Sequence, residues 1–276
     1  MNSGIFGLEN GFFGKVVFLG LACEYGSTGA KGCGRAPDII KELAGHSFAS
    51  NETYMKNVSD AGVLRFNPEV QISNYLEGVE LIVKKIASES KIPFSFGGDH
   101  LIAYPLIKGV LKHHSRLQVL HIDAHFDCNT IDANSAPAHN NFVNYLCCEP
   151  EIEKWIAVGQ RSLSVVKKTL PNKFIKSDSE NFIKYIDASL PIYITIDFDV
   201  LDPFQFPAVS FPEPGPGLTW GDLLSIISEI KNANLNIVGI DISEYNPHMD
   251  YKNYICGKYI VNFISKTLAI LLGENL

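Results

Sequence analysis

The chain has 276 residues, of which 46% are hydrophobic and 19% charged, and its formal net charge is −7. The hydrophobic share is enough for a substantial core. The acidic balance argues against nucleic acid or a membrane surface as a partner, because both attract basic proteins. No linker or repeat divides the sequence, so we expect a single domain over residues 1–276, although a length of ~150 residues per domain would suggest two.

Short apolar runs, bounded by glycine or polar turns, alternate with segments of helical periodicity along the chain. The apolar runs predict strands near 16–21, 92–96, 117–122, 155–158, 192–197 and 237–242. The periodic segments predict helices near 35–44, 74–90, 101–113, 179–189, 219–231 and 255–272. Thr219 and Asp222 are expected to form a capping box at the start of the fifth helix. The alternation predicts an α/β fold with a mostly parallel sheet that helices cover on both faces.

The cysteines of the chain lack the regular spacing of a disulfide framework, so we expect a reduced, cytoplasmic setting. The apolar run at 16–23 ends in Cys23, and only Lys15 precedes it as a basic residue. This run is short and has no cleavage pattern, so we interpret it as the first strand and not as a secretion signal. No segment approaches the ~18 consecutive apolar residues of a membrane span, and we expect no membrane partner.

Three short motifs follow three of the predicted strands: GGDH at 97–100, DAHFD at 123–127 and DFD at 197–199. Residues two apart in a strand point to the same side, and the carboxyl ends of parallel strands are where ligands gather. We therefore expect these polar side chains to form one metal site, although each alone would be interpreted as a turn cap or a strand end. The candidate metal ligands are His100, Asp123, His125, Asp127, Asp197 and Asp199.

The charges of these candidate ligands indicate how many ions they bind. They include four carboxylates, so one divalent ion would leave a large negative charge uncompensated, whereas two would balance it. Oxygen ligands with a minority of imidazole favour Mn²⁺ over Zn²⁺, although Fe, Co and Ni fit the same ligands. Two such ions about 3.5–4 Å apart can bridge a water and deprotonate it. The expected cofactor is two Mn²⁺ per chain.

At these motifs the chain resembles the ureohydrolase family, the group of arginases and agmatinases. The similarity continues through TIDFDVLDP at 195–203, FPEPGPGLT at 211–219 and GIDISEYNP at 239–247, in the order of the family. The resemblance implies a three-layer α/β/α sandwich of the arginase type. It also implies a homo-oligomer and a hydrolase that converts a guanidino group to urea and a primary amine.

The resemblance assigns roles to three further positions. His139 matches the histidine that transfers protons in the family, and a neutral-range pKa would suit it to protonate the departing amine. Glu244 matches the glutamate that binds the guanidinium group, with which a carboxylate can form two parallel hydrogen bonds. The candidate catalytic residues are therefore His139, Glu244 and the metal ligand Asp127. Asp241 is expected to orient ligands and not to bind metal directly.

The identity of the guanidine substrate is less well defined by the sequence. Asn129 matches the asparagine with which arginases bind the substrate α-carboxylate, so the candidate substrate-binding residues are Asn129, His139 and Glu244. Ser162 and Ser164, however, stand where arginases carry aspartates, one of which binds the α-ammonium group. We rank an arginine side chain first, free or within a peptide, with ornithine as the product. Agmatine or guanidinobutyrate is the alternative.

Two other interpretations remain open. A protein that keeps the fold and the metal without turnover would explain Leu101, Val209-Ser210 and Asn140, which replace residues common in the family. A deacetylase on a related fold would need a single Zn²⁺ and fewer carboxylates. The complete ligand set favours the ureohydrolase over both. His121, inside a predicted strand, is expected to be a hydrogen-bonded core histidine and not a further ligand.

Overall fold

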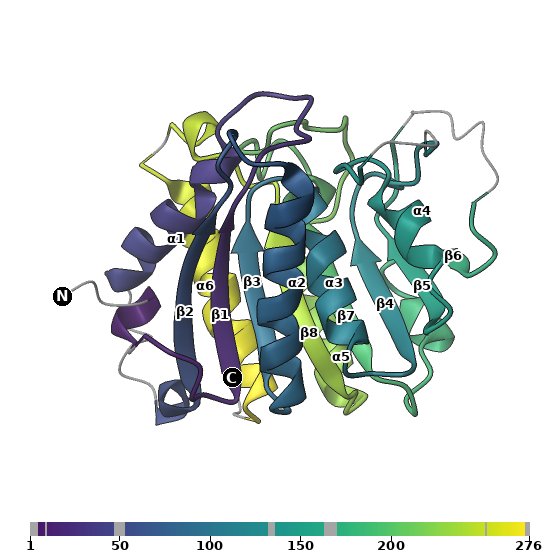
Figure 1. Cartoon of the computed structure of the whole chain (residues 1–276). Coiled ribbons are helices and arrows are strands. Elements are labelled where there is room, and N and C mark those ends of the chain that lie inside the picture. Colours follow the sequence, from purple (N-terminus) through teal and green to yellow (C-terminus); the bar gives the residue numbers. More distant parts are fainter. Residues whose placement is uncertain are drawn as a thin grey trace.

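The central element of the fold is a sheet of eight strands (Figure 1). The computed structural model describes residues 5–8, 10–46, 53–131, 136–162, 170–251 and 253–273. The strands are β1 (Val16–Ala22), β2 (Val58–Arg65), β3 (Ile92–Gly97), β4 (Leu117–Ile122), β5 (Ile152–Val158), β6 (Phe174–Ser177), β7 (Ile192–Asp197) and β8 (Ile237–Ser243). Their order in the sheet is β2-β1-β3-β8-β7-β4-β5-β6, and every neighbouring pair is parallel.

Helices cover both faces of this sheet, because its central strands are apolar on both sides. All six residues of β4 and of β7 are buried. The helices are α1 (Ala36–Gly45), α2 (Ile72–Ser88), α3 (Ala103–Leu111), α4 (Phe142–Cys147), α5 (Trp220–Asn232) and α6 (Ile255–Leu271). Apolar residues of α1, α5 and α6 pack on one face, and those of α2, α3 and α4 pack on the other. The predicted three-layer α/β/α sandwich is confirmed.

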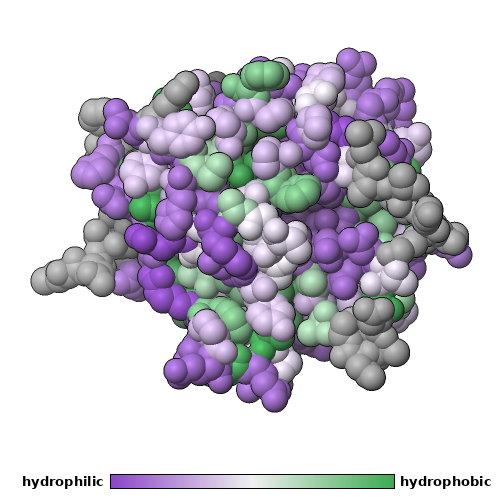
Figure 2. Space-filling model, turned by 90° about the horizontal axis from the view of Figure 1, so that it is seen from above, coloured by the Kyte–Doolittle hydropathy of each residue, from purple (hydrophilic) through white to green (hydrophobic). Residues whose placement is uncertain are grey.

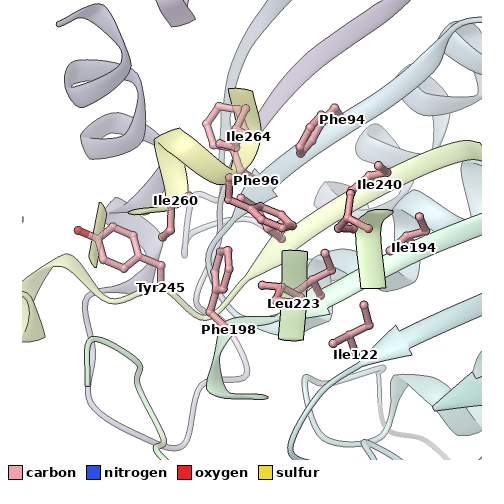
Figure 3. Packing of buried hydrophobic residues seen from close by; sticks show 14 of the residues in the cluster. Phe94, Phe96, Ile122, Ile194, Phe198, Leu223, Ile240, Tyr245, Ile260 and Ile264 are labelled. Carbon is pink, nitrogen blue, oxygen red and sulfur yellow. The ribbon is translucent and has the colours of Figure 1, made fainter. Parts of the chain in front are cut away.

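The larger of the two apolar clusters lies between the sheet and the helices α1, α5 and α6. Figure 3 shows strand residues facing residues of α5 and α6 there. The labelled side chains from the strands are Phe94, Phe96, Ile122, Ile194 and Ile240, and those from the helices are Leu223, Ile260 and Ile264. Helix α5 begins as predicted, because Thr219 and Asp222 form a reciprocal capping box.

The sequence-based elements differ from the structure in four places. The edge strands β2 and β6 were not predicted, because polar residues interrupt their apolar runs, namely Ser59 and Asp60 in β2 and Lys176 in β6. The predicted helix at 179–189 is wrong: the segment contains one 3-10 turn, Phe182–Tyr185. Asp178 accepts hydrogen bonds from the backbone of Glu180 and Asn181, which favours a turn over a helix. Helix α4, with six residues, is too short for its periodicity to be recognised.

The carboxyl ends of the strands lie along the upper edge of the molecule in Figure 1, where the long connecting loops gather. Figure 2 looks down on this edge, on which hydrophilic residues alternate with small groups of hydrophobic ones. Among the described residues, the helices are all too short or too polar to cross a membrane. The candidate functional residues follow β3, β4, β7 and β8, the four adjacent strands at the centre of the sheet.

Candidate metal centre

The six candidate ligands converge at the carboxyl ends of β3, β4 and β7. His100 opens the 3-10 turn after β3, and Asp197 is the last residue of β7. Asp199 lies in the next 3-10 turn, Phe198–Val200, where its backbone N–H donates to Asp197. All three are buried, as is Asp123 directly after β4. The structure thus brings together the side chains that the period of the strands placed on one side.

Asp123 lies between His100 and His125 and belongs to both groups of the cluster. Its Oδ2 lies 3.0 Å from His100 Nδ1, and its Oδ1 lies 3.5 Å from His125 Nδ1. Oxygens of Asp127 and Asp197 lie 3.2 Å and 3.4 Å from His100 Nδ1, while Asp199 lies 2.7 Å from His125 Nδ1. His100, Asp123 and Asp127, with His121 beside them, have the composition and spacing to hold a metal ion. So do Asp123, His125 and Asp199, and the two groups share Asp123.

The other ring nitrogen of each histidine contacts a residue outside the cluster. His100 Nε2 lies 2.8 Å from Thr195 Oγ1, which in turn donates to Asp241. His125 Nε2 lies 3.0 Å from Glu213 Oε1. Such contacts fix the tautomer of a metal-binding histidine and the orientation of its ring. Because Nε2 of both histidines makes these contacts, Nδ1 is the ring nitrogen that points into the cluster. Asp241 orients His100 through Thr195.

His121 supports Asp123 from inside β4. Trp155 Nε1 donates to His121 Nδ1 at 3.2 Å, and His121 Nε2 lies 2.8 Å from Asp123 Oδ2. Because Nδ1 accepts a hydrogen bond, Nε2 must carry the proton and donate it to Asp123. His121 therefore has no lone pair left for a metal, although it lies within ligand distance of the first group. It is a buried, hydrogen-bonded histidine, as expected.

The electrostatics of the cluster favour a multivalent cation. Burial and the neighbouring carboxylates raise the pKa of Asp127 to about 6, that of Asp197 to about 7 and that of Asp199 to about 6. His100 Nδ1 is buried and makes no hydrogen bond, although carboxylate oxygens surround it. A lone pair aimed at a group of acceptors is the arrangement that a bound cation would satisfy. The residues present thus fit a metal centre.

The backbone at two of these positions adopts a conformation that most side chains avoid. Asp127 has φ 44° and Glu244 has φ 65°, both in the left-handed region. A non-glycine residue in this conformation destabilises the folded state by about 1–3 kcal/mol, and such residues concentrate at functional sites. Next to them, a Cβ at Gly98 would overlap the carbonyl oxygen of Cys23, so only glycine allows the loop after β3 to approach that backbone. These constraints fix the positions of Asp127, Glu244 and the GGDH segment.

Glu244 follows β8 and is held beside the metal centre. Its N–H donates to the carbonyl of Gly98 at 2.8 Å, and its Oε1 accepts from the backbone N–H of His100 at 3.1 Å. Burial, and then the charge of Asp197, raise the pKa of Glu244 well above its usual value. A cation that pairs with this carboxylate would restore its charge. The site is therefore suited to a cationic group such as a guanidinium.

Part of the centre lines a pocket of about 490 Å³, namely His125, Asp127, Asp197, Asp199 and Glu244. The wall and rim of the pocket consist mainly of polar residues from loops, namely Ser27, Thr28, Gly29, Asn129, His139, Asn140, Ser162, Ser210, Phe211 and Glu213. His139 Nε2 lies 3.4 Å from Thr28 Oγ1, and Asn129 is exposed at the rim. Ser164, a predicted departure from the arginase pattern, lies outside the described residues.

The pKa of His139 differs from the neutral-range value expected from the sequence. Burial is the main cause, and it lowers the pKa of His139 to about 4. His139 is therefore neutral at physiological pH and can accept a proton before it donates one. His139 lines the pocket together with Asn129 and Glu244.

Three residues that contact the site were not singled out from the sequence: Thr195, Glu213 and Arg161. Thr195 precedes the DFD motif on the same side of β7, so strand periodicity was a signal for it. Glu213 stands in the FPEPGPGLT motif, where a charged residue among prolines and glycines was a signal. Arg161 donates to backbone carbonyls of Val200, Asp199 and other loop residues. No sequence pattern marks such contacts.

Comparison with known proteins gives matches over most of the chain. The model of the Arginase family matches residues 14–269. An agmatinase of Bacillus anthracis is 31% identical over 251 residues, which cover 87% of this chain and 86% of that protein. An arginase of Bacillus subtilis is 28% identical over 227 residues, 70% of this chain and 73% of the other. Most of the well-matched relatives are named agmatinase.

A solved structure shows the same fold. The proclavaminate amidino hydrolase from Streptomyces clavuligerus superimposes with a TM-score of 0.83 at 19% identity, covering 100% of this chain and 98% of that one. At this identity the likeness concerns the fold alone. The arrangement of strands around the cluster is therefore shared with proteins of divergent sequence.

Proposed function

The chain belongs to the arginase family, and we propose that it is a binuclear manganese enzyme that hydrolyses a small guanidine to urea and a primary amine. The observation that carries this proposal is the pair of His/Asp groups that share Asp123, in a pocket that also contains Glu244. The first group would hold one ion through His100, Asp123, Asp127 and Asp197. The second would hold another through His125, Asp123 and Asp199.

The residues of the pocket divide the reaction among them. When bound, two divalent ions would lower the pKa of a shared water, so that hydroxide is available at neutral pH. Glu244 binds the planar guanidinium and holds its central carbon at the carboxylate cluster. His139, neutral at physiological pH, accepts a proton from the attacking oxygen and transfers it to the leaving nitrogen. The C–N bond to the leaving nitrogen then breaks, and urea and the amine are formed.

Among guanidines, we propose an agmatine-type substrate first. The sequence ranked an arginine side chain first because of Asn129. Most relatives, however, are named agmatinase, and Ser162 has no charge with which to bind an α-ammonium group. Arginine is the second candidate. It is favoured by Asn129, which lies at the pocket rim, where an α-carboxylate would be found.

Urea release tests the proposal directly. Protein loaded with Mn²⁺ is incubated in parallel with agmatine, free arginine, 4-guanidinobutyrate and an arginine-containing peptide, and urea is measured over time. We expect urea from agmatine at the highest kcat/KM. Higher turnover of arginine would favour the second candidate. If none of the four releases urea although two ions per chain are bound, the protein is a metal-binding member of the fold without this activity.

A further inference from the structure

Glu213 brings a further carboxylate into the pocket, in addition to Glu244 and the aspartates of the metal centre. It belongs to the proline-rich loop 211–219, and its side chain is 10% exposed. Its Oε1 accepts a hydrogen bond from Ser162 Oγ at 2.9 Å and lies 3.0 Å from His125 Nε2. Both contacts use Oε1, and within the described residues Oε2 has no hydrogen-bond partner. One oxygen of Glu213 is thus available to a ligand in the pocket.

The nearest arginine does not neutralise this carboxylate. The Arg161 guanidinium donates to the backbone carbonyls of Asp199, Val200 and Leu201, and to those of Glu213 and Pro214. These hydrogen bonds fix the proline-rich loop against the end of β7 and leave the carboxylate of Glu213 unpaired by arginine. Within the described residues, its one ion-pair partner is His125, which would be neutral as a metal ligand. The charge of Glu213 therefore acts on the pocket.

The position of Glu213 relates to the substitution at Ser162. The family resemblance places an aspartate of arginases at position 162, and this chain has an uncharged serine there. In the structure Ser162 donates to a carboxylate that comes from a loop about 50 residues further along the chain. The loop that contains Ser162 has no carboxylate at this position, and Glu213 of the proline-rich loop provides one. The pocket thus has carboxylates at two places, Glu244 beside the metal centre and Glu213 in the wall.

We propose that Glu213 binds the second cation of the substrate and thereby selects guanidines that carry an amine at the far end. This inference rests on the proposed function and specifies its substrate class. A guanidinoalkylamine has a positive charge at both ends, which matches Glu244 and Glu213. A guanidino acid would bring its terminal carboxylate towards Glu213, and like charges in a partly buried pocket repel. Glu213 is in this account a specificity-determining residue.

The decisive variant is Glu213→Gln, which keeps the size of the side chain and an oxygen acceptor for Ser162 and His125 but removes the charge. The substrates are agmatine, 4-guanidinobutyrate and butylguanidine, which end in a cation, an anion and a neutral methyl group. A charged hydrogen bond contributes about 1.5–3 kcal/mol, or roughly 10–100-fold. We expect KM for agmatine to rise by that factor with little change in kcat. We expect KM for butylguanidine to stay constant and that for 4-guanidinobutyrate to fall.

Two further variants control the experiment. Glu213→Asp keeps the charge and should keep the preference for agmatine over butylguanidine. Glu153→Gln makes the same chemical change on the surface, where Glu153 pairs with Arg116, and should alter none of the three KM values. A role of Glu213 limited to orienting His125 would lower kcat for all three substrates equally and reduce the Mn²⁺ content of the variant. That result would overturn the proposal.

A binding measurement separates this inference from the proposed function. Calorimetry on the Mn²⁺-loaded protein compares 1,4-diaminobutane, the amine product from agmatine, with butylamine, which lacks the second cation. The wild type should bind the diamine more tightly, and Glu213→Gln should abolish the difference. If the wild type hydrolyses guanidines but Glu213→Gln changes no substrate preference, the inference fails and the proposed function stands. If no guanidine is hydrolysed, the proposed function fails, and the diamine comparison still decides the role of Glu213.

Discussion

Asp123 and His121 show how one side chain of the centre depends on another. Asp123 directs one oxygen to each histidine of the centre. It is held there by His121, whose tautomer is in turn fixed by Trp155. The three residues come from β5, β4 and the loop after β4. The orientation of Asp123 is therefore set by residues in the interior of the sheet.

His121→Phe tests this dependence. The variant keeps all six candidate ligands and the volume of an aromatic ring but removes the hydrogen bond to Asp123. Loss of a residue that orients a ligand reduces metal affinity by about 10–100-fold, and we expect that decrease in a calorimetric titration with Mn²⁺. Trp155→Phe, which removes the donor to His121 alone, should have a smaller effect. Unchanged Mn²⁺ affinity in His121→Phe would show that Asp123 needs no support.

The titration of the centre predicts how metal binding depends on pH. The pKa values of Asp127, Asp197 and Asp199 are raised to about 6, 7 and 6 by burial and by neighbouring carboxylates. Protons therefore compete with Mn²⁺ for these oxygens below about pH 7, and affinity should increase as pH rises from about 5.5 to about 8. Proton release on binding, measured by calorimetry in buffers of different ionisation enthalpy, checks the sign. Affinity that is constant over this range would contradict the account.

At the scale of elements, the sequence predicts what local periodicity determines. The central strands were found from their apolar runs, and the three ligand motifs from the period of two that places alternate side chains on one side. The edge strands β2 and β6 were not predicted, because polar residues interrupt their apolar runs. Contacts between loops were not predicted either. No local sequence pattern indicates that Glu213 contacts His125, which is 88 residues away in the sequence. Such contacts depend on how the whole chain folds.

Arg161 connects two loops, and its loss should have a clear effect on stability. Its guanidinium joins the turn after β7 to the proline-rich loop through backbone carbonyls. Arg161→Met keeps most of the aliphatic side chain and leaves those carbonyls without their donor. We expect the free energy of unfolding to fall by about 1–3 kcal/mol, measured by denaturant titration. Arg116→Met, which removes an exposed ion pair, should lower the free energy of unfolding much less, because solvent screens such pairs. If both substitutions lowered the free energy of unfolding equally, Arg161 would not stabilise the protein by joining these two loops.

For the molecule as a whole, the order of the strands determines where the site forms. Strand β8 lies between β3 and β7, and β4 follows β7. Segments that are far apart in the sequence thus end side by side, and candidate ligands from β4 and β7 line one pocket with Glu244. The sequence predicted the three layers, and it predicted that these side chains would gather at one edge of the sheet. It did not predict the strand order, because pairing of β3 with β8 joins segments separated by most of the chain.

The most direct test of the account is a titration of metal-depleted protein with Mn²⁺, in which bound ions per chain and urea release from agmatine are measured on the same samples. Two groups that share Asp123 predict that urea release levels off only when two ions are bound to each chain. Full activity with one ion per chain, or two bound ions without urea from any guanidine, would contradict a binuclear ureohydrolase.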